Sequence, residues 1–327
     1  PNYSVPARNK KLTKTFIKNT IDKYNHIKNL LKKTPGGHGI HFSKKSILEF
    51  TKSKRLKILE KAWLNGGLSY RECFSDITKK ISANKIVSNY IRDKIKKIVK
   101  DKNIAKILTD FGHPFTTKRP TLNTNYFETF NRKNVQLVDL KTNPIIKITK
   151  KGIKTKNEEL KFDKIIFATG YDALTGPILS LNLTGRKNIK LKKYWKNGPK
   201  TFLGIMIPNF PNFFIISGPG SPSVLTNVPA QIEQHVEWIS KFIKYLEKVE
   251  CRTVEPGRKE TENWVNEINR LANKSLFMKA KNSWYKGDNI PGKPKKFIPY
   301  PAGLPQYREI CNKVQKKMYK GFNISLK

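Results

Sequence analysis

The stretch FATGYDALTGP, residues 167–177, decides which class of fold we expect for this chain. The apolar run Lys164–Phe167 predicts a buried strand, and Ala168, Thr169 and Gly170 after it leave room for a ligand to approach the backbone. This arrangement is typical of the carboxyl edge of a parallel sheet that binds a dinucleotide. The phosphate-binding sequence G-x-G-x-x-G, which opens such sheets, does not occur in the chain. The stretch therefore predicts the later part of a dinucleotide-binding sheet without its beginning.

Upstream of this stretch, three short β-branched runs predict further strands. These are Val135–Val138, Ile145–Ile148 and Ile153–Thr155, and the last two form a hairpin that turns at Lys151 and Gly152. We therefore expect sheet structure from about residue 116 onwards.

Downstream, Phe213–Ser217 predicts a strand that runs into Gly218, Pro219 and Gly220. A helix is expected over Pro229–Glu247, because its apolar residues recur at helical spacing. These residues are Ile232, Val236, Ile239, Ile243 and Leu246. A strand, a glycine-rich loop and a helix can direct backbone N–H groups at an electron-rich ligand atom, but many such loops hold glycine only for turn geometry.

Residues 9 to about 110 have a different pattern and predict helices without strands. The residues Ile86, Tyr90, Ile91, Ile95, Ile98 and Val99 make one apolar stripe, and lysines fill the other face. The turn Thr34–Gly37 breaks the first helix, and Gly66-Gly67 breaks another.

The charge of the chain is strongly positive, with 66 Lys and Arg against 24 Asp and Glu, a formal net charge of +42. Such a balance is common in proteins that bind nucleic acid. The excess is mostly Lys spread from end to end, without a basic helix face or a stack of aromatic side chains. We therefore attribute it to a coding bias towards Lys, Asn and Ile, and expect no nucleic-acid partner.

Cysteine and histidine give no sign of a metal site. Cys73, Cys251 and Cys311 are odd in number and form no C-x-x-C pair, which argues for a reducing, cytoplasmic setting. His38 and His41 lack a third ligand nearby and are read as loop residues, while His26, His113 and His235 receive no role. No run of about 18 apolar residues occurs, so we expect no membrane span.

Several blocks of residues, spread nearly end to end, make the most specific pattern in the chain. They are Asn2–Asn9, Lys118–Pro120, Asn125–Asn131, FATGYDALTG, Asn209–Asn212, Gly218–Asn227, Glu233–Trp238, Ser283–Tyr285 and Asn289–Pro294. In this order and at this spacing, the blocks resemble flavin-dependent Baeyer–Villiger monooxygenases of the phenylacetone and cyclohexanone monooxygenase kind.

The resemblance implies an α/β fold of two interleaved dinucleotide-binding (Rossmann-like) domains, incomplete here, with an all-helical insertion. Residues 1–8 and 116–171 would be closing parts of the NADP-binding domain, 9–115 the helical insertion, and 172–327 the carboxyl-terminal part of the FAD-binding domain. Both glycine fingerprints of the family lie further upstream. We therefore expect the chain to be a fragment that is inactive alone.

The resemblance also implies the cofactors FAD and NADP and a small-molecule ketone substrate. In this family, NADPH reduces FAD, a flavin peroxide forms with O2, and one oxygen atom is inserted into the ketone to give an ester or lactone. Such chemistry needs a permanent cation beside the developing negative charge. Arg119 matches the family's catalytic arginine, and its alternative role is that of a surface residue capping a loop.

The resemblance carries over further residues one by one. Lys118 matches a residue that contacts the 2′-phosphate of NADP, and Trp284 matches one at its nicotinamide end, although Trp284 could serve in packing alone. The cofactor-binding residues Ala168, Thr169, Gly170 and Asp172 lie at the domain crossing, with turn capping as the alternative for Asp172. Gly218, Pro219 and Gly220 would approach the flavin ring. The residues Ser223, Val224, Leu225 and Thr226 would line the ketone pocket.

Two other functions remain open from the sequence. A sister flavoprotein that oxidises nitrogen or sulfur would share the cofactors, but Lys118-Arg119 favours the ketone-oxidising branch. A non-catalytic basic domain that binds nucleic acid would instead show tight, steeply salt-dependent DNA binding.

Overall fold

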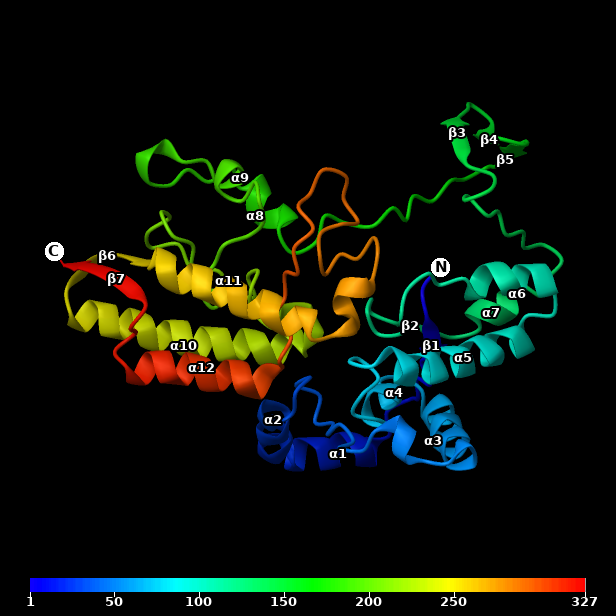
Figure 1. Ribbon diagram of the computed structural model, residues 1–327, viewed down its shortest axis with the longest axis horizontal. Coiled ribbons are helices and arrows are strands. Elements are labelled where there is room, and N and C mark those ends of the chain that lie inside the picture. The colour runs from blue at the N-terminus through cyan, green and yellow to red at the C-terminus, as the bar shows by residue number, and fades with distance from the viewer. Residues whose placement is uncertain (327) are drawn as a thin grey trace.

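The computed structural model describes residues 1–326, which form two packed blocks and a small separate sheet (Figure 1). The α-helices are α1 (Lys14–Asp22), α2 (Tyr24–Lys33), α3 (Lys52–Asn65), α4 (Ser69–Glu72), α5 (Ile81–Ile98), α6 (Lys102–Thr109), α7 (Tyr126–Thr129), α8 (Gly176–Ser180), α9 (Leu191–Tyr194), α10 (Val228–Lys248), α11 (Arg258–Asn273) and α12 (Leu304–Lys316). The strands are β1 (Ser4–Pro6), β2 (Thr121–Asn123), β3 (Ile145–Ile148), β4 (Gly152–Thr155), β5 (Glu159–Lys161), β6 (Cys251–Pro256) and β7 (Phe322–Leu326). Short 3-10 helices cover Ile47–Glu49, Arg186–Asn188, Ser223–Leu225 and Leu276–Lys279.

The amino-terminal block is helical from α1 to α6, as the sequence predicts. The predicted stripe forms one face of α5, on which Ile91 and Ile95 are fully buried. Both predicted breaks are confirmed, because α2 ends just before Thr34 and α3 just before Gly66. A side chain at Gly66, where φ is +67°, would lie 2.3 Å from the carbonyl oxygen of Pro6, so only glycine fits.

β1 and β2 form a two-stranded parallel sheet that joins the start of the chain to the segment after the helical block. Ser4 pairs with Thr121 and Pro6 with Asn123. Of the three sheets in the described residues, this is the one whose strands run parallel. The mixed helix-and-strand character agrees with the expected class, but residues 1–326 alone contain no extended parallel sheet.

The carboxyl-terminal block packs α10, α11 and α12 with the antiparallel pair β6–β7 (Figure 1). Its core is rich in aromatic side chains, among them Trp238, Phe242 and Tyr307. The helix predicted over 229–247 is confirmed as α10, but its predicted buried face is partly wrong. Ile232, Val236 and Ile243 of the predicted stripe are exposed.

The face of α10 that is buried instead carries polar residues. Gln231, Gln234 and His235 lie inside, and hydrogen bonds satisfy the imidazole of His235. The backbone N–H of Ser217 donates to Nδ1 of His235 at 3.2 Å, and Nε2 lies 2.7 Å from the hydroxyl of Tyr307 on α12. Hydrophobic spacing therefore placed Ile239 and Leu246 correctly inside but missed the polar part of the buried face.

Three predicted strands are not formed, and the reason is the lack of a hydrogen-bonded neighbour. Val135–Val138 and Lys164–Phe167 have no regular structure, and Ile166 is 91% exposed. Phe213–Ser217 makes one isolated bridge, between Phe214 and Met206, and Ile215 donates to the carbonyl of Ile205 at 2.7 Å. These segments are apolar, as the sequence indicates, but no second strand within residues 1–326 pairs with them along their length.

The predicted hairpin is confirmed as β3 and β4, with Ile148 paired to Ile153. The sequence analysis missed β5, which adds a third antiparallel strand. Figure 1 shows this sheet standing apart from both blocks, with long irregular segments leading to it and away from it.

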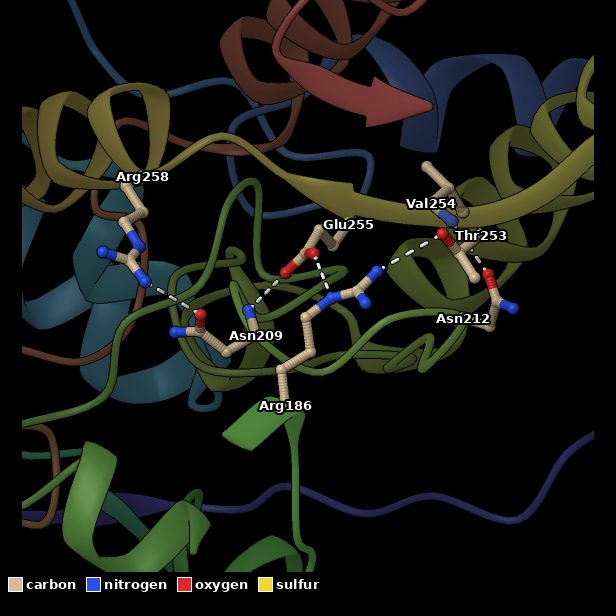
Figure 2. A network of polar contacts seen from close by, with 7 residues as sticks. All are labelled: Arg186, Asn209, Asn212, Thr253, Val254, Glu255 and Arg258. Carbon is tan, nitrogen blue, oxygen red and sulfur yellow. Dashed lines mark hydrogen bonds and ion pairs between the residues drawn. The ribbon is translucent and has the colours of Figure 1, made fainter. Parts of the chain in front are cut away.

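The segment before the glycine-rich loop is fastened to β6 by the network in Figure 2. The carboxylate of Glu255 pairs with Arg186 at 2.7 Å and accepts from the backbone N–H of Asn209 at 2.5 Å. Asn212 extends the edge of β6, since its side-chain oxygen and its N–H both bond to Val254 at 2.9 Å. Both asparagines have positive φ, which this residue type tolerates well. The conspicuous block Asn209–Asn212 thus has a structural task.

Candidate functional site

A cavity of about 750 Å³ lies where the helical block meets the carboxyl-terminal block. Arg71, Phe115 and Arg119 contribute its wall on the helical side. Leu225 and Trp284 contribute the opposite wall. Since these residues lie far apart in the sequence, the docking of the two blocks creates the cavity.

The turn Thr34–Gly37 holds the two blocks together at this point. The carbonyl oxygen of Pro35 accepts from the N–H of Leu304 at 2.9 Å, and that of Gly36 accepts from Asn227 at 2.7 Å. Leu304 begins α12 and Asn227 caps α10, so one turn fixes the start of two helices. An ion pair between Lys28 and Glu233 at 3.1 Å lies nearby.

Asn84 of α5 fixes the segment that leads to Arg119. Its amide nitrogen donates to the carbonyl oxygens of Ile77 at 2.8 Å and Phe115 at 2.9 Å, and its oxygen accepts from the N–H of Phe115 at 2.9 Å. Arg119 itself is held through its backbone, because its carbonyl oxygen accepts from the side chain of Asn2 at 2.8 Å. Its guanidinium makes no hydrogen bond or ion pair within residues 1–326 and lines the cavity.

Four predicted site residues meet in this cavity: Arg119, Val224, Leu225 and Trp284. Ser223 and Thr226 do not line it, because both are buried and the hydroxyl of Thr226 donates to the carbonyl of Ser223 at 3.0 Å. The predicted pocket segment therefore presents only its two apolar residues to the cavity.

Lys118 lies beside the cavity, close to the loop that carries Trp284. Burial lowers the pKa of its ammonium group, while the carboxylate of Asp288 opposes this shift. Asp288 is itself paired with Lys286 at 3.1 Å. Lys118 is thus a half-buried cation next to an existing ion pair.

The residues expected at the domain crossing lie away from the cavity. Ala168, Thr169 and Gly170 are exposed in a segment without regular structure. Asp172 pairs with Lys293 of the block Asn289–Pro294, which also donates to Thr175 at 2.7 Å. Two separate sequence blocks are therefore joined here, a contact that the sequence did not reveal.

Gly218, Pro219 and Gly220 are buried, and Pro219 and Gly220 line a smaller cavity of about 190 Å³. The N–H of Gly220 donates to Ile298 at 2.9 Å, and its carbonyl oxygen accepts from the indole of Trp264 at 3.1 Å. Gly220 has φ of +90°. The loop is thus fixed by internal hydrogen bonds in a conformation that glycine allows.

The sequence analysis did not assign several residues of the cavity wall to the site. Two of them are Arg71, which carries a positive charge, and His38, which can gain one. Burial lowers the pKa of the Arg71 guanidinium, and burial followed by the charges of Arg71 and Arg119 lowers the pKa of His38. His38 is therefore neutral at pH 7. Only the rarity of arginine in this sequence could have drawn attention to Arg71, since the chain has 11 arginines against 55 lysines.

The cavity offers hydrogen-bond donors and no carboxylate. No Asp or Glu of the described chain lines it, and the buried hydroxyl of Tyr70 at its wall has no hydrogen-bond partner there. Two arginines without a carboxylate beside them favour a ligand with oxygen atoms that carry negative charge. Among residues 1–326 there is no group of three His, Cys, Asp or Glu that could bind a metal, and none of their helices is long and apolar enough to cross a membrane.

No family model matches the chain. Several named proteins, however, are similar to it in sequence over nearly its whole length. Cyclohexanone 1,2-monooxygenase of an Acinetobacter species is 36% identical over 99% of this chain and 59% of its own length. Phenazine N-monooxygenase PhzNO1 of Lysobacter antibioticus is 33% identical over 98% of this chain and 59% of its own. The chain thus spans about three fifths of the length of these relatives.

A solved structure agrees with the chain closely. The complex of OTEMO with FAD and NADP superposes with a TM-score of 0.95 at 30% identity, over 99% of this chain and 60% of that one. Identity of this size along nearly the entire chain, together with a matching fold, shows common descent. Over nearly its whole length, the chain is similar in sequence and in fold to flavoprotein Baeyer–Villiger monooxygenases.

Proposed function

We propose that this chain is the part of an FAD- and NADPH-dependent monooxygenase that holds a ketone while one oxygen atom of O2 is inserted beside its carbonyl. The observation that carries the proposal is the meeting of Arg119, Trp284, Val224 and Leu225 in one cavity. These residues come from distant parts of the sequence, and each was assigned to the site from the resemblance alone.

The chemistry of the cavity fits this reaction. Oxygen insertion builds negative charge on oxygen atoms, and a cation held beside them stabilises such charge. Arg119 is permanently charged and has no protein partner within residues 1–326, so its guanidinium is free to donate to the substrate oxygen. When bound, FAD and NADPH supply the reducing equivalents and the activated oxygen.

The other residues have supporting tasks. Val224 and Leu225 form an apolar wall that excludes water and orients the ketone. Trp284 would contact the nicotinamide end of NADP, and Lys118 its 2′-phosphate, for which a point charge suffices. Gly218, Pro219 and Gly220 would approach the flavin ring.

The fold of the whole enzyme is part of the proposal. We infer that residues 1–8 and 116–171 close an NADP-binding domain, that 9–115 are a helical insertion, and that 172–327 belong to an FAD-binding domain interleaved with it. The remaining two fifths of the relatives' length would precede these residues and contain both glycine fingerprints. The exposed apolar side chains of Ile166 and Phe167 support this, because an added strand would cover them.

The test is lactone formation from cyclohexanone with FAD, NADPH and O2, measured for the chain alone and for the chain joined to the unmatched amino-terminal part of cyclohexanone 1,2-monooxygenase. We expect the lactone from the joined protein only. Arg119→Ala should lower kcat by about 100-fold or more, the usual effect of removing one donor to a developing oxyanion. Arg132→Ala, which removes an exposed arginine outside the cavity, is the matched control.

The same assay separates the second candidate function. The similarity to a phenazine N-monooxygenase favours trying an aromatic amine as substrate. N-oxide formation without any lactone would assign the chain to the nitrogen-oxidising branch and contradict the proposal.

A further inference from the structure

Arg71 is a charged residue of the cavity wall whose role nothing above explains. It lies on the short helix α4, and its guanidinium stands 5.5 Å from the centre of the Phe42 ring. Within residues 1–326 the guanidinium makes no ion pair and donates no hydrogen bond, whereas the backbone N–H of Arg71 donates to the carbonyl of Leu68 at 2.8 Å. Arg186 and Arg270, by contrast, pair with Glu255 and Glu267.

Keeping this cation without a partner is costly. A guanidinium has five N–H donors and stays charged at any physiological pH. Arg71 is partly buried, which removes water from some of those donors and lowers the pKa of the guanidinium; Tyr285 opposes this shift, and the positive charge of Arg119 adds to it. A packing role would be filled at lower cost by Met or Leu, which lack the charge. The position is therefore suited to a group of opposite charge that arrives with a ligand.

The location of Arg71 indicates which part of a ligand it would bind. A second cavity of about 500 Å³ adjoins the first, and Arg71 and Leu225 line both. The second cavity adds Lys79 and Lys274, and neither cavity is lined by an Asp or Glu of the described chain. A ligand that reaches from Arg119 past Leu225 would therefore meet a second positive charge.

We propose that Arg71 is a specificity-determining residue that binds a carboxylate on the substrate, so that the enzyme takes keto acids in preference to neutral ketones. The proposal rests on the function proposed above for the same cavity. In this arrangement, Arg119 serves the carbonyl oxygen and Arg71 the carboxylate, while Leu225 covers the carbon skeleton between them. The planar guanidinium matches the two oxygens of a carboxylate, which a lysine in the same place would not.

Binding is measured first, because it does not depend on turnover. The probes are 4-oxocyclohexanecarboxylate and its methyl ester, which share a skeleton and differ in charge. Calorimetric titration of the full chain should give a Kd about 10 to 100 times lower for the carboxylate, the range for a charged hydrogen bond. Arg71→Met should remove this difference and leave the Kd of the ester nearly unchanged, while Arg71→Lys should restore part of it.

Arg132→Met is the control, since it removes one positive charge from an exposed site outside both cavities. It should keep the full preference for the carboxylate. Equal affinity for both probes, no binding of either, or a preference that survives in a folded Arg71→Met variant would each overturn the proposal. Circular dichroism of every variant shows whether it is folded.

Turnover by the joined protein separates the two proposals. A carboxylate preference in binding without any lactone would contradict the monooxygenase function and leave the carboxylate site in place. Lactone formed from both probes with equal kcat/KM would confirm the function and overturn the role of Arg71.

Discussion

The helical block and the segment around residues 135–171 respond differently to the same kind of sequence pattern. In the helical block, the apolar stripe of α5 packs into the core, with Ile91 and Ile95 fully buried. In the later segment, the apolar runs 135–138 and 164–167 remain irregular, and only the hairpin β3–β4 with β5 forms. A helix satisfies its own backbone hydrogen bonds, whereas a strand needs a neighbour, and this neighbour must be available within the chain. The difference shows that an apolar pattern indicates a segment that can be buried, but does not indicate whether the chain contains a strand to pair with it.

The largest contrast between the two regions should appear in proteolysis. Phe167 and Tyr171 are exposed in an irregular segment, whereas Phe115 and Phe127 are buried in the helical block. Chymotrypsin should cut at 167 or 171 more than about 100-fold faster than at the buried sites, because cutting there requires no unfolding. Mass spectrometry of the first fragments measures this. Early cuts at Phe115 or Phe127 would mean that the helical block is no more stable than the segment.

The next contrast is in core packing. Ile91→Ala should lower the free energy of unfolding by about 3 kcal/mol, since it opens a cavity in the core of the helical block. Ile146→Ala in β3 should cost about 0.5 kcal/mol or less, because Ile146 is 61% exposed. Urea denaturation followed by circular dichroism gives both values. Similar losses in the two variants would contradict the comparison.

Buried asparagines offer a third test. Asn84→Ala should cost about 2 kcal/mol, because it leaves backbone groups of Ile77 and Phe115 without partners. Asn143→Ala removes only an acceptor for the N–H of Asn157 within the small sheet, and about 1 kcal/mol is expected. The same denaturation measurement gives both values. A larger loss of unfolding free energy for Asn143→Ala than for Asn84→Ala would contradict the comparison.

The last test concerns pH and the buried imidazole of His113. Burial lowers the pKa of His113 from 6.5 to about 4, so the folded chain keeps this imidazole neutral while the unfolded chain takes up a proton below pH 6.5. Stability is therefore complete above about pH 6.5 and falls as the pH drops towards 4. About 2 kcal/mol of the loss at pH 4 should come from His113, after allowance for solvent screening.

The control for the pH effect is His113→Phe, which cannot titrate and can keep the edge contact with the ring of Tyr3. Its unfolding free energy should fall less between pH 7 and pH 4 than that of the parent chain. An equal fall in both proteins would assign the acid sensitivity to other groups, such as His235, whose pKa burial also lowers to about 4.

The sequence predicted the helices well because their signals are local. α10 begins and ends within a residue of the predicted bounds, yet its buried face could not be foreseen, since the partners of His235 come from Ser217 and Tyr307 elsewhere in the chain. For the site, Arg119, Trp284, Val224 and Leu225 were found through resemblance to a family. Arg71 was not found, because it belongs to no sequence motif and becomes notable only when the two blocks dock and form the cavity.

The turn Thr34–Gly37 has a consequence for motion. Its two backbone hydrogen bonds, to Asn227 and Leu304, lie where the helical block meets the starts of α10 and α12. A rotation about this turn would change the width of the cavity, since both blocks contribute its walls. Because both blocks contribute walls, any ligand that contacts both would favour the closed arrangement, so binding and block orientation are thermodynamically linked. We expect 4-oxocyclohexanecarboxylate to reduce the radius of gyration of the chain in solution scattering, and an unchanged radius at saturation would rule out such a rotation.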